Sequence, residues 1–299
     1  MYIDLSKMNS GFCDRLRQVT FCIAYEQLKN NKFKLIEIYE KKNSECPFYI
    51  SELINIKNYL IKNVKKKNKN VIKMDPFNSE ITLKNCYKYN NMSTIDNYAL
   101  LEKWKEIYRL IKPKKKIYYK LLKLKRFKKY LSLHIRLTDK LVSFKSHILE
   151  IPTKDVIYKK QFSEFYDNIE RIIPSGYKYI YISSDENIFK NKIKKKLDGK
   201  FQFIDTNNKF NKKKLRQTSG QDFIFDLFAM SKSAIIISST GGNVPYTSNL
   251  ISNKKQEYIK WTSYKSKYKF FKIVRTLISI LRKILNFNNF YFRKYFTNI

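Results

Sequence analysis

The predicted fold is organised around the stretch Leu131-Ser132-Leu133-His134-Ile135-Arg136-Leu137-Thr138-Asp139-Lys140. The run from Tyr130 to Ile135 is mostly apolar and contains no Gly or Pro, which predicts a buried strand. Its end carries four polar side chains: His134, Arg136, Thr138 and Asp139. Ligands of open α/β sheets bind beyond the carboxyl ends of strands, so this strand end predicts a binding site. The alternative is a strand that ends in a solvated turn.

The chain on the carboxyl side of this strand alternates between predicted helices and strands. Helices are predicted over Lys154–Ile173, Asn187–Leu197 and Asp222–Met230, and strands over Tyr177–Ser183, Phe201–Ile204 and Ala234–Ser238. A polar loop, Ser239–Asn243, and a short helical segment follow. Alternation of this kind indicates a parallel, doubly wound sheet.

The chain on the amino side begins with a similar unit. A short strand, Met1–Leu5, leads through Ser10-Gly11 into a helix over about Asp14–Asn30. A strand, a glycine turn and a helix direct helix amides toward an anion or a substrate. Arg15 and Arg17 lie on the first turns of this helix, where a capped helix start with exposed arginines is the alternative. Further elements are a strand over Phe33–Glu40, a possible strand within Met74–Leu83 and a helix over Tyr98–Ile111.

The segment Lys112–Lys129 joins these two halves and is dense in lysine. Its composition predicts a solvated linker, because runs of charge usually form solvated faces. A basic patch that faces the acceptor or a lipid is the functional alternative.

The overall charge is strongly positive, +37 over 299 residues, which first suggests nucleic acid. Only 10 of the 62 basic residues are Arg, however, and the chain is rich in residues that A/T-rich codons encode. The high lysine content is therefore attributed to an A/T-rich coding sequence rather than to a nucleic-acid partner, and no nucleic acid is expected. Arginine is the informative cation, since its planar fork matches a phosphate.

The four cysteines are far apart and only two histidines are present, so no Cys/His metal site is expected. Unpaired cysteines and the lack of a signal-peptide pattern favour a reducing cytoplasmic compartment. No apolar run is long enough for a predicted transmembrane helix. The tail Tyr264–Ile299 has nine basic and no acidic residues, with apolar positions on one helical face. It predicts either a helix on the inner face of an anionic membrane or a final helix across the domains.

Four segments, in this order, resemble motifs of the GDP-fucose-dependent fucosyltransferases, a group that includes core α1,6, nodulation and O-fucosyltransferase-like enzymes. Gly11–Arg17 resembles the glycine loop GGLGxRLR, and His134–Lys140 resembles HxRxTDK. Tyr181–Glu186 resembles a hydrophobic-then-acidic segment, and Asp222–Ser239 a helix–strand unit before the last donor loop. The resemblance implies an α/β fold with two Rossmann-like, doubly wound domains (GT-B type) and a basic amphipathic C-terminal tail. The expected bounds are 1–128 for the acceptor-side domain, 129–263 for the GDP-sugar domain and 264–299 for the tail.

The resemblance also implies roles for individual residues. Arg136 would stabilise the leaving diphosphate, because no DxD motif is present to hold a metal, and no cofactor is expected. The α1,6 enzymes have a candidate acidic base where this chain has Phe144, so the nearby carboxylates Asp139 and Glu150 are the candidates for activating the acceptor, and the choice between them stays open. The other expected donor-binding residues are Gly11, Arg15, Arg17, His134, Thr138, Asp185, Asp226, Thr240, Gly241, Gly242 and Asn243.

The implied function is that of an inverting, metal-independent glycosyltransferase. It would move a sugar, fucose by resemblance, from a GDP-sugar to a glycan acceptor in surface polysaccharide or lipopolysaccharide synthesis. The chain departs from the family pattern at Leu137 and at Gly241-Gly242, which leaves the donor sugar and the linkage open. A catalytically degenerate glycan-binding relative and a basic nucleic-acid-binding protein are the alternatives.

Overall fold

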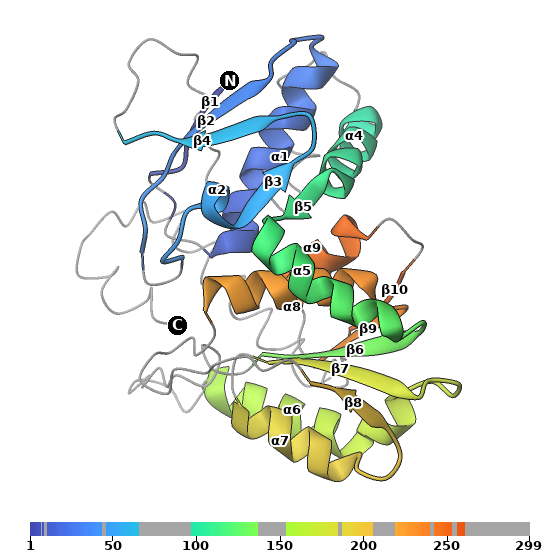
Figure 1. Ribbon diagram of the computed structural model, residues 1–299. Helices are drawn as coiled ribbons and strands as arrows, with labels where there is room; N and C mark the ends of the chain where they lie inside the picture. Colours follow the sequence, from blue (N-terminus) through green and yellow to red (C-terminus); the bar gives the residue numbers. More distant parts are fainter. Residues whose placement is uncertain are drawn as a thin grey trace, which may run out of the picture. The chain divides into compact units, whose positions relative to one another are not determined.

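The computed structural model describes residues 1–6, 8, 11–43, 46–65, 97–136, 154–184, 187–205, 219–239, 242–252 and 256–260. These residues form a mixed α/β fold with parallel sheets (Figure 1). The possible strand within Met74–Leu83 and the tail Tyr264–Ile299 lie outside the described residues.

The described chain divides into two compact units. The first contains the described residues of Met1–Leu131, Ser219–Ile236 and Gly242–Tyr258. The second contains those of Ser132–Thr218, Ile237–Gly241 and Ile259–Ile299. The domain bounds expected from the sequence stay a prediction.

The first unit contains a three-stranded parallel sheet of order β1-β2-β4 and a two-stranded antiparallel sheet, β3-β5. These strands are β1 (Tyr2–Asp4), β2 (Leu35–Tyr39), β3 (Ile54–Ile56), β4 (Leu60–Asn63) and β5 (Ile111–Pro113). The helical segments of this unit are α1 (Phe12–Leu28), α2 (Ile50–Leu53), α4 (Asn97–Arg109), α5 (Lys115–Leu122), the 3-10 helix η2 (Lys123–Arg126), α8 (Gly220–Lys232) and α9 (Asn243–Ile251).

The core of the first unit lies around α1, most of whose residues are buried. Helix α4 packs against it: Trp104 Nε1 donates to Thr20 Oγ1 at 2.8 Å, and the Trp104 ring meets Phe21 edge-on. The indole thus buries a large apolar surface while its only polar group is satisfied. Helix α8 packs against both α9 and α5.

The second unit is built on a five-stranded sheet of order β10-β9-β6-β7-β8. Its strands are β6 (Tyr130–Ile135), β7 (Tyr179–Ser184), β8 (Gln202–Ile204), β9 (Ile235–Ser238) and β10 (Glu257–Lys260), and three of them, β6, β9 and β10, begin in the first unit. Helices α6 (Lys154–Ile172) and α7 (Asn187–Lys196) lie on one face of the sheet (Figure 1). They meet through the rings of Phe162 and Phe189, 4.7 Å apart.

Most predicted elements are present with small shifts of their ends. Strand β6 has the predicted bounds, and all six of its residues are buried. The prediction of a linker over Lys112–Lys129 is wrong, because this segment contains β5, α5 and η2. The physical reason is that Ile117, Leu121 and Leu124 recur at helical spacing and are buried, whereas the lysines between them face water.

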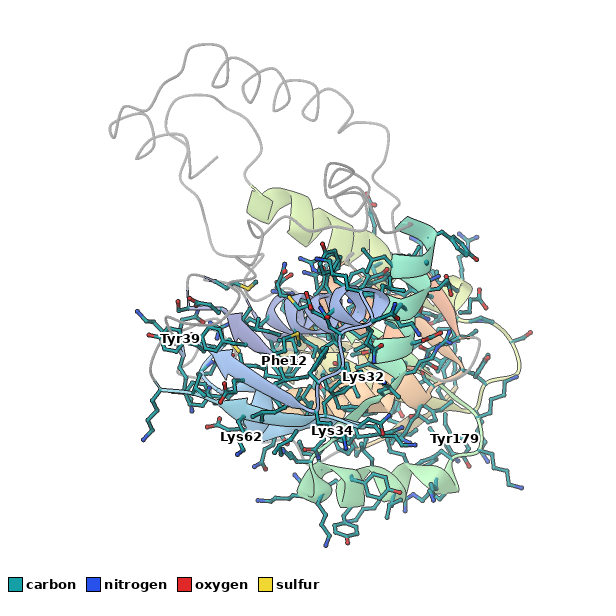
Figure 2. All side chains as sticks on the ribbon, turned by 90° about the horizontal axis from the view of Figure 1, so that it is seen from above. Phe12, Lys32, Lys34, Tyr39, Lys62 and Tyr179 are labelled. Atoms are coloured by element: carbon teal, nitrogen blue, oxygen red, sulfur yellow. The ribbon has the colours of Figure 1, made fainter. Side chains whose placement is uncertain are left out.

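The lysines of the described chain lie mainly on its surface. Lys32, Lys34 and Lys62 are labelled examples in Figure 2, and all three are exposed. Among the described helices, none has the length and apolar character that crossing a bilayer requires.

Candidate functional site

The carboxyl end of β6, in the second unit, brings His134 close to β9. The His134 ring is buried, and its Nδ1 lies 3.2 Å from Ser238 Oγ. Directly after β9, the backbone amide of Ser239 donates a hydrogen bond to the carbonyl oxygen of His134 at 3.0 Å. Backbone and side chain therefore fix the histidine at the strand end.

The environment of His134 keeps its imidazole neutral. Burial and, to a smaller extent, the nearby positive charge of Arg136 together lower the pKa of His134 to about 3. At neutral pH the ring therefore has one donor nitrogen and one acceptor nitrogen. It can orient a polar ligand, but it cannot contribute a positive charge to a phosphate.

The neutral histidine makes the stability of the fold sensitive to acid. Below pH 6.5 the unfolded chain takes up a proton at His134, whereas the folded chain does so only near pH 3. The contribution of neutral His134 to the free energy of unfolding is therefore complete above pH 6.5. It falls by about 1.4 kcal/mol per pH unit as the pH drops from 6.5 toward 3. We expect His134→Gln to reduce the pH slope of the unfolding free energy by about this amount, measured by urea denaturation between pH 7 and 5. An unchanged slope would mean that the ring titrates alike in both states.

Arg136 follows β6 directly and is half-buried. It takes part in interactions within the chain, and its positive charge contributes to the lowered pKa of His134. A guanidinium held at a strand end can form parallel hydrogen bonds to two oxygens of one phosphate. The structure thus brings together His134 and Arg136, two of the residues that the sequence predicts for the site.

Six predicted site residues lie outside the described part of the chain. They are Thr138, Asp139, Glu150, Asp185, Thr240 and Gly241. Their roles in binding the donor or activating the acceptor stay predictions.

A second polar group forms at the start of α1, in the first unit. Gly11 is the N-cap of α1 with an extended backbone, and its carbonyl accepts hydrogen bonds from the amides of Asp14 and Arg15. Gly242 is the N-cap of α9 in the same way. Gly11 and Gly242, two of the three predicted glycines, therefore stand at helix N-termini, where backbone amides favour an anion.

Asp14 connects these two helix starts. Its Oδ1 accepts a hydrogen bond from Asn243 Nδ2 at 2.6 Å and is ion-paired with Arg17 at 3.0 Å. Asp14 lies inside the Gly11–Arg17 motif but is not among the residues predicted for the site. The missing signal was distance, because Asn243 is 229 residues away along the chain.

Buried polar atoms near Asp14 lack partners. In the part of the chain that the structure describes, Arg17 Nε and both amide atoms of Gln18 are buried without a hydrogen bond. Positions 14, 17 and 18 share one face of α1. Buried polar groups are normally satisfied, so these atoms mark a place where a polar ligand or water would be stabilised.

Arg15 has a different environment from Arg17. Its side chain is fully buried, pairs with Glu40 at 3.2 Å and donates to the Met8 carbonyl oxygen at 3.2 Å. Glu40 in turn accepts a hydrogen bond from the Ile50 amide at 2.8 Å. These contacts give Arg15 a structural role, and its predicted contact with the donor stays a prediction.

Asp226 lies in the middle of α8 and is buried, with interactions inside the protein. It belongs to the first unit, as do Arg17 and Asn243. Its predicted contact with a guanine base stays a prediction. Among the described residues, no three His, Cys, Asp or Glu side chains form a group that could hold a metal ion.

No family model and no curated protein sequence matches the chain. Solved structures do match its fold. One is the NodZ α1,6-fucosyltransferase co-crystallised with GDP, with a TM-score of 0.52, 11% identity and coverage of 84% of this chain and 92% of that one. Others are POFUT1 with GDP and POFUT1 with GDP-fucose, each with a TM-score of 0.50. They are 11% and 10% identical, and both alignments cover 87% of this chain and 98% of the other. The chain therefore has the fold of the GDP-fucose-dependent fucosyltransferases, which the four motifs indicated.

Proposed function

We propose that this protein is a glycosyltransferase that transfers a sugar, fucose, from a GDP-sugar to a hydroxyl of a glycan. The observation that carries the proposal is the end of β6, where Arg136 stands beside a buried and neutral His134. The proposal is supported by the fold, which is shared with proteins crystallised with GDP and GDP-fucose. We further propose two Rossmann-like domains of the GT-B type, and a glycan acceptor of surface polysaccharide or lipopolysaccharide synthesis.

In the proposed reaction the acceptor oxygen attacks the anomeric carbon as the bond to GDP breaks. Attack from the face opposite the leaving group inverts the configuration. Negative charge then develops on the diphosphate, and the Arg136 guanidinium is placed to stabilise it. Asp139 or Glu150 would accept the proton of the acceptor hydroxyl. His134, uncharged, would orient the nucleotide by a hydrogen bond.

The ligand specificity can be tested by thermal unfolding with a panel of nucleotides. A nucleotide at about one hundred times its Kd stabilises the folded state by about 2.7 kcal/mol, which is a shift of several degrees in Tm. We expect GDP and GDP-fucose to give this shift and ADP and UDP to give none. Stabilisation by DNA or RNA with a steep dependence on salt would instead support a nucleic-acid-binding protein. GDP binding without any transfer or hydrolysis would support a degenerate glycan-binding relative.

We expect the activity to be independent of metal ions, because the proposed charge stabilisation comes from Arg136 and backbone amides. The rate of GDP-fucose hydrolysis, measured as the release of GDP, should be the same in EDTA and in manganese. A rate that falls to the background in EDTA and returns with manganese would contradict this part of the proposal.

A further inference from the structure

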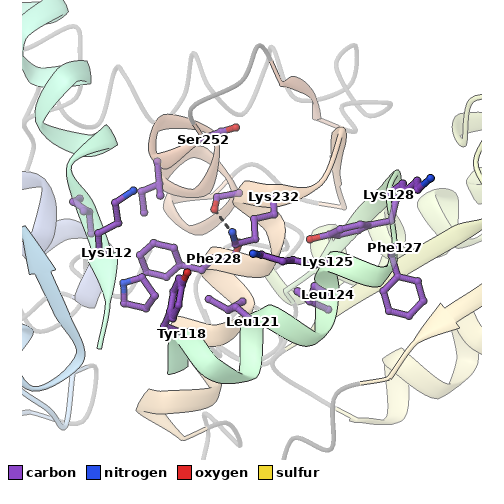
Figure 3. Close-up of a pocket in the computed structure, with 15 residues that line it drawn as sticks. Lys112, Tyr118, Leu121, Leu124, Lys125, Phe127, Lys128, Phe228, Lys232 and Ser252 are labelled. Atoms are coloured by element: carbon purple, nitrogen blue, oxygen red, sulfur yellow. Dashed lines mark hydrogen bonds between the residues drawn. The ribbon is translucent and has the colours of Figure 1, made fainter. Parts of the chain in front are cut away.

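The first unit contains a cavity of about 510 Å³ that the proposed function does not use. It is lined by residues of β5, α5 and η2 and by the carboxyl ends of α8 and α9 (Figure 3). This volume lies within the range of about 300 to 1,000 Å³ that is typical of small-molecule sites.

One part of the cavity wall is apolar. Leu121, Leu124, Phe228 and Ile251 contribute to it, and each is at most 5% exposed. These side chains come from α5, η2, α8 and α9, so the wall is part of the folded core rather than a surface loop. A ligand that fits against it must carry an apolar portion.

The other part of the wall is positively charged. Lys112, Lys125, Lys128 and Lys232 line the cavity, and no acidic residue is among its lining residues. Figure 3 shows Lys125 of η2 and Lys232 of α8 near the middle of the cavity, Lys112 of β5 at its edge, and Lys128 pointing outward. Within the described chain, Lys112, Lys125 and Lys128 form no ion pair.

These lysines are not required to satisfy the end of α8. The carbonyls of Phe228, Met230 and Ser233 already accept hydrogen bonds from Ser231, Ser233 or Gln256. Lys112 and Lys125, which form no ion pair within the described residues, therefore offer positive charge to an anion. A concentration of ammonium groups beside an apolar wall matches a ligand with the opposite charge and an apolar body.

We propose that this cavity binds the phosphate headgroup of an anionic lipid, with the lysines on the phosphate and the apolar wall against the first carbons of the chain. Two aromatic side chains of α5, Tyr118 and Tyr119, support a lipid source, since they are 45% and 55% exposed. Tyrosine among lysines is typical of surfaces that meet a membrane interface. The proposal does not depend on the transferase activity.

The test uses a pair of double variants with the same change in charge. Lys112→Gln/Lys125→Gln removes two cavity lysines, and Lys116→Gln/Lys123→Gln removes two exposed lysines of the same segment that do not line the cavity. The probe is dihexanoyl phosphatidic acid below its micelle concentration, with inorganic phosphate and dihexanoyl phosphatidylcholine as comparisons. Binding is measured by calorimetry on the full chain.

We expect the wild type and the control variant to bind the phosphatidic acid equally and to bind neither comparison compound. The cavity variant should bind it roughly one hundredfold more weakly, because each of two charge-assisted hydrogen bonds accounts for about a factor of ten. Since all four lysines are exposed, the Tm without ligand should stay the same in both variants.

Three results would overturn the proposal. Equal loss of affinity in both variants would show attraction by surface charge without a site. Inorganic phosphate binding as tightly as the lipid would show a site for free phosphate. No binding of the phosphatidic acid, or binding only of an oligonucleotide in the same assay, would remove the lipid. GDP binding, measured in parallel, reports on the proposed transferase separately.

Discussion

Arg136→Lys is expected to lower kcat/KM for GDP-fucose roughly one hundredfold without changing the stability of the protein. The substitution keeps the positive charge, so simple attraction would give a mild effect. A lysine cannot form two parallel bonds to a pair of phosphate oxygens, because its ammonium is a point charge on a flexible stem. The lost bonds strengthen as charge develops on the leaving diphosphate, so the loss falls mainly on the transition state.

The matched control for this variant is Arg171→Lys, an exposed arginine at the end of α6. It should leave activity and Tm at wild-type values. If no acceptor is known, donor hydrolysis and the affinity for GDP replace kcat/KM. Near-normal activity and affinity of Arg136→Lys would mean that Arg136 is only a strand-end residue, and the proposed site would be misplaced.

Removing one partner of the buried pair between Arg15 and Glu40 is expected to destabilise the protein by about 3 to 5 kcal/mol. Both side chains are fully buried, and their ion pair is 3.2 Å long. In Glu40→Gln the guanidinium stays buried without its counter-charge. Because the folded pKa of Glu40 is raised, the wild type itself loses stability as the pH rises, so the loss in Glu40→Gln should be smaller at pH 8 than at pH 5.

Arg15→Met should behave differently, because Glu40 can take up a proton. Burial already raises the pKa of Glu40, with the Ile50 amide and Arg15 acting against it. A raised folded pKa means that the contribution of Glu40 to stability is complete below its unfolded pKa and is lost as the pH rises through the folded value. Without Arg15 the folded pKa rises further, so Arg15→Met should lose more stability at pH 8 than at pH 5.

Urea denaturation at these two values of pH checks both variants, and the double variant Arg15→Met/Glu40→Gln isolates the pair. The double variant should recover part of the loss at pH 8, since it leaves no unpaired charge. If the loss of stability in the double variant equals the sum of the losses in the two single variants, Arg15 and Glu40 have no interaction energy as a pair. Lower GDP affinity of Arg15→Met at unchanged stability would instead support a role for Arg15 in donor binding.

The sequence predicted best what depends on neighbouring residues. Strand β6 was predicted with the correct bounds because an uninterrupted apolar run has few alternatives in a folded chain. Helix α5 was missed because ten basic residues between Lys112 and Lys129 obscure the helical spacing of Ile117, Leu121 and Leu124. Burial of those three side chains against the rest of the unit decided the structure, and composition alone does not report it.

The candidate site shows the same division. The sequence pointed to His134 and Arg136 together because only Ile135 separates them, and the structure adds that burial holds the histidine neutral. It also named Arg17 and Asn243, but not Asp14, which bonds to both. The pairing of Arg15 with Glu40 was not predicted either, because the two residues are 25 positions apart along the chain. Contacts across long stretches of chain are set by packing, which no local pattern contains.

The first unit is discontinuous along the chain, and this has a consequence for its synthesis. Helix α5 ends at Leu122, and α8, against which it packs, begins only at Gly220. At about 5 to 20 residues per second, a ribosome needs roughly 5 to 20 s to cover that interval. During this time the apolar face of α5 has no α8 to cover it, and such faces promote aggregation. The lysines on the outer side of the same helix would then oppose aggregation before folding is complete, because like charges on different nascent chains repel one another.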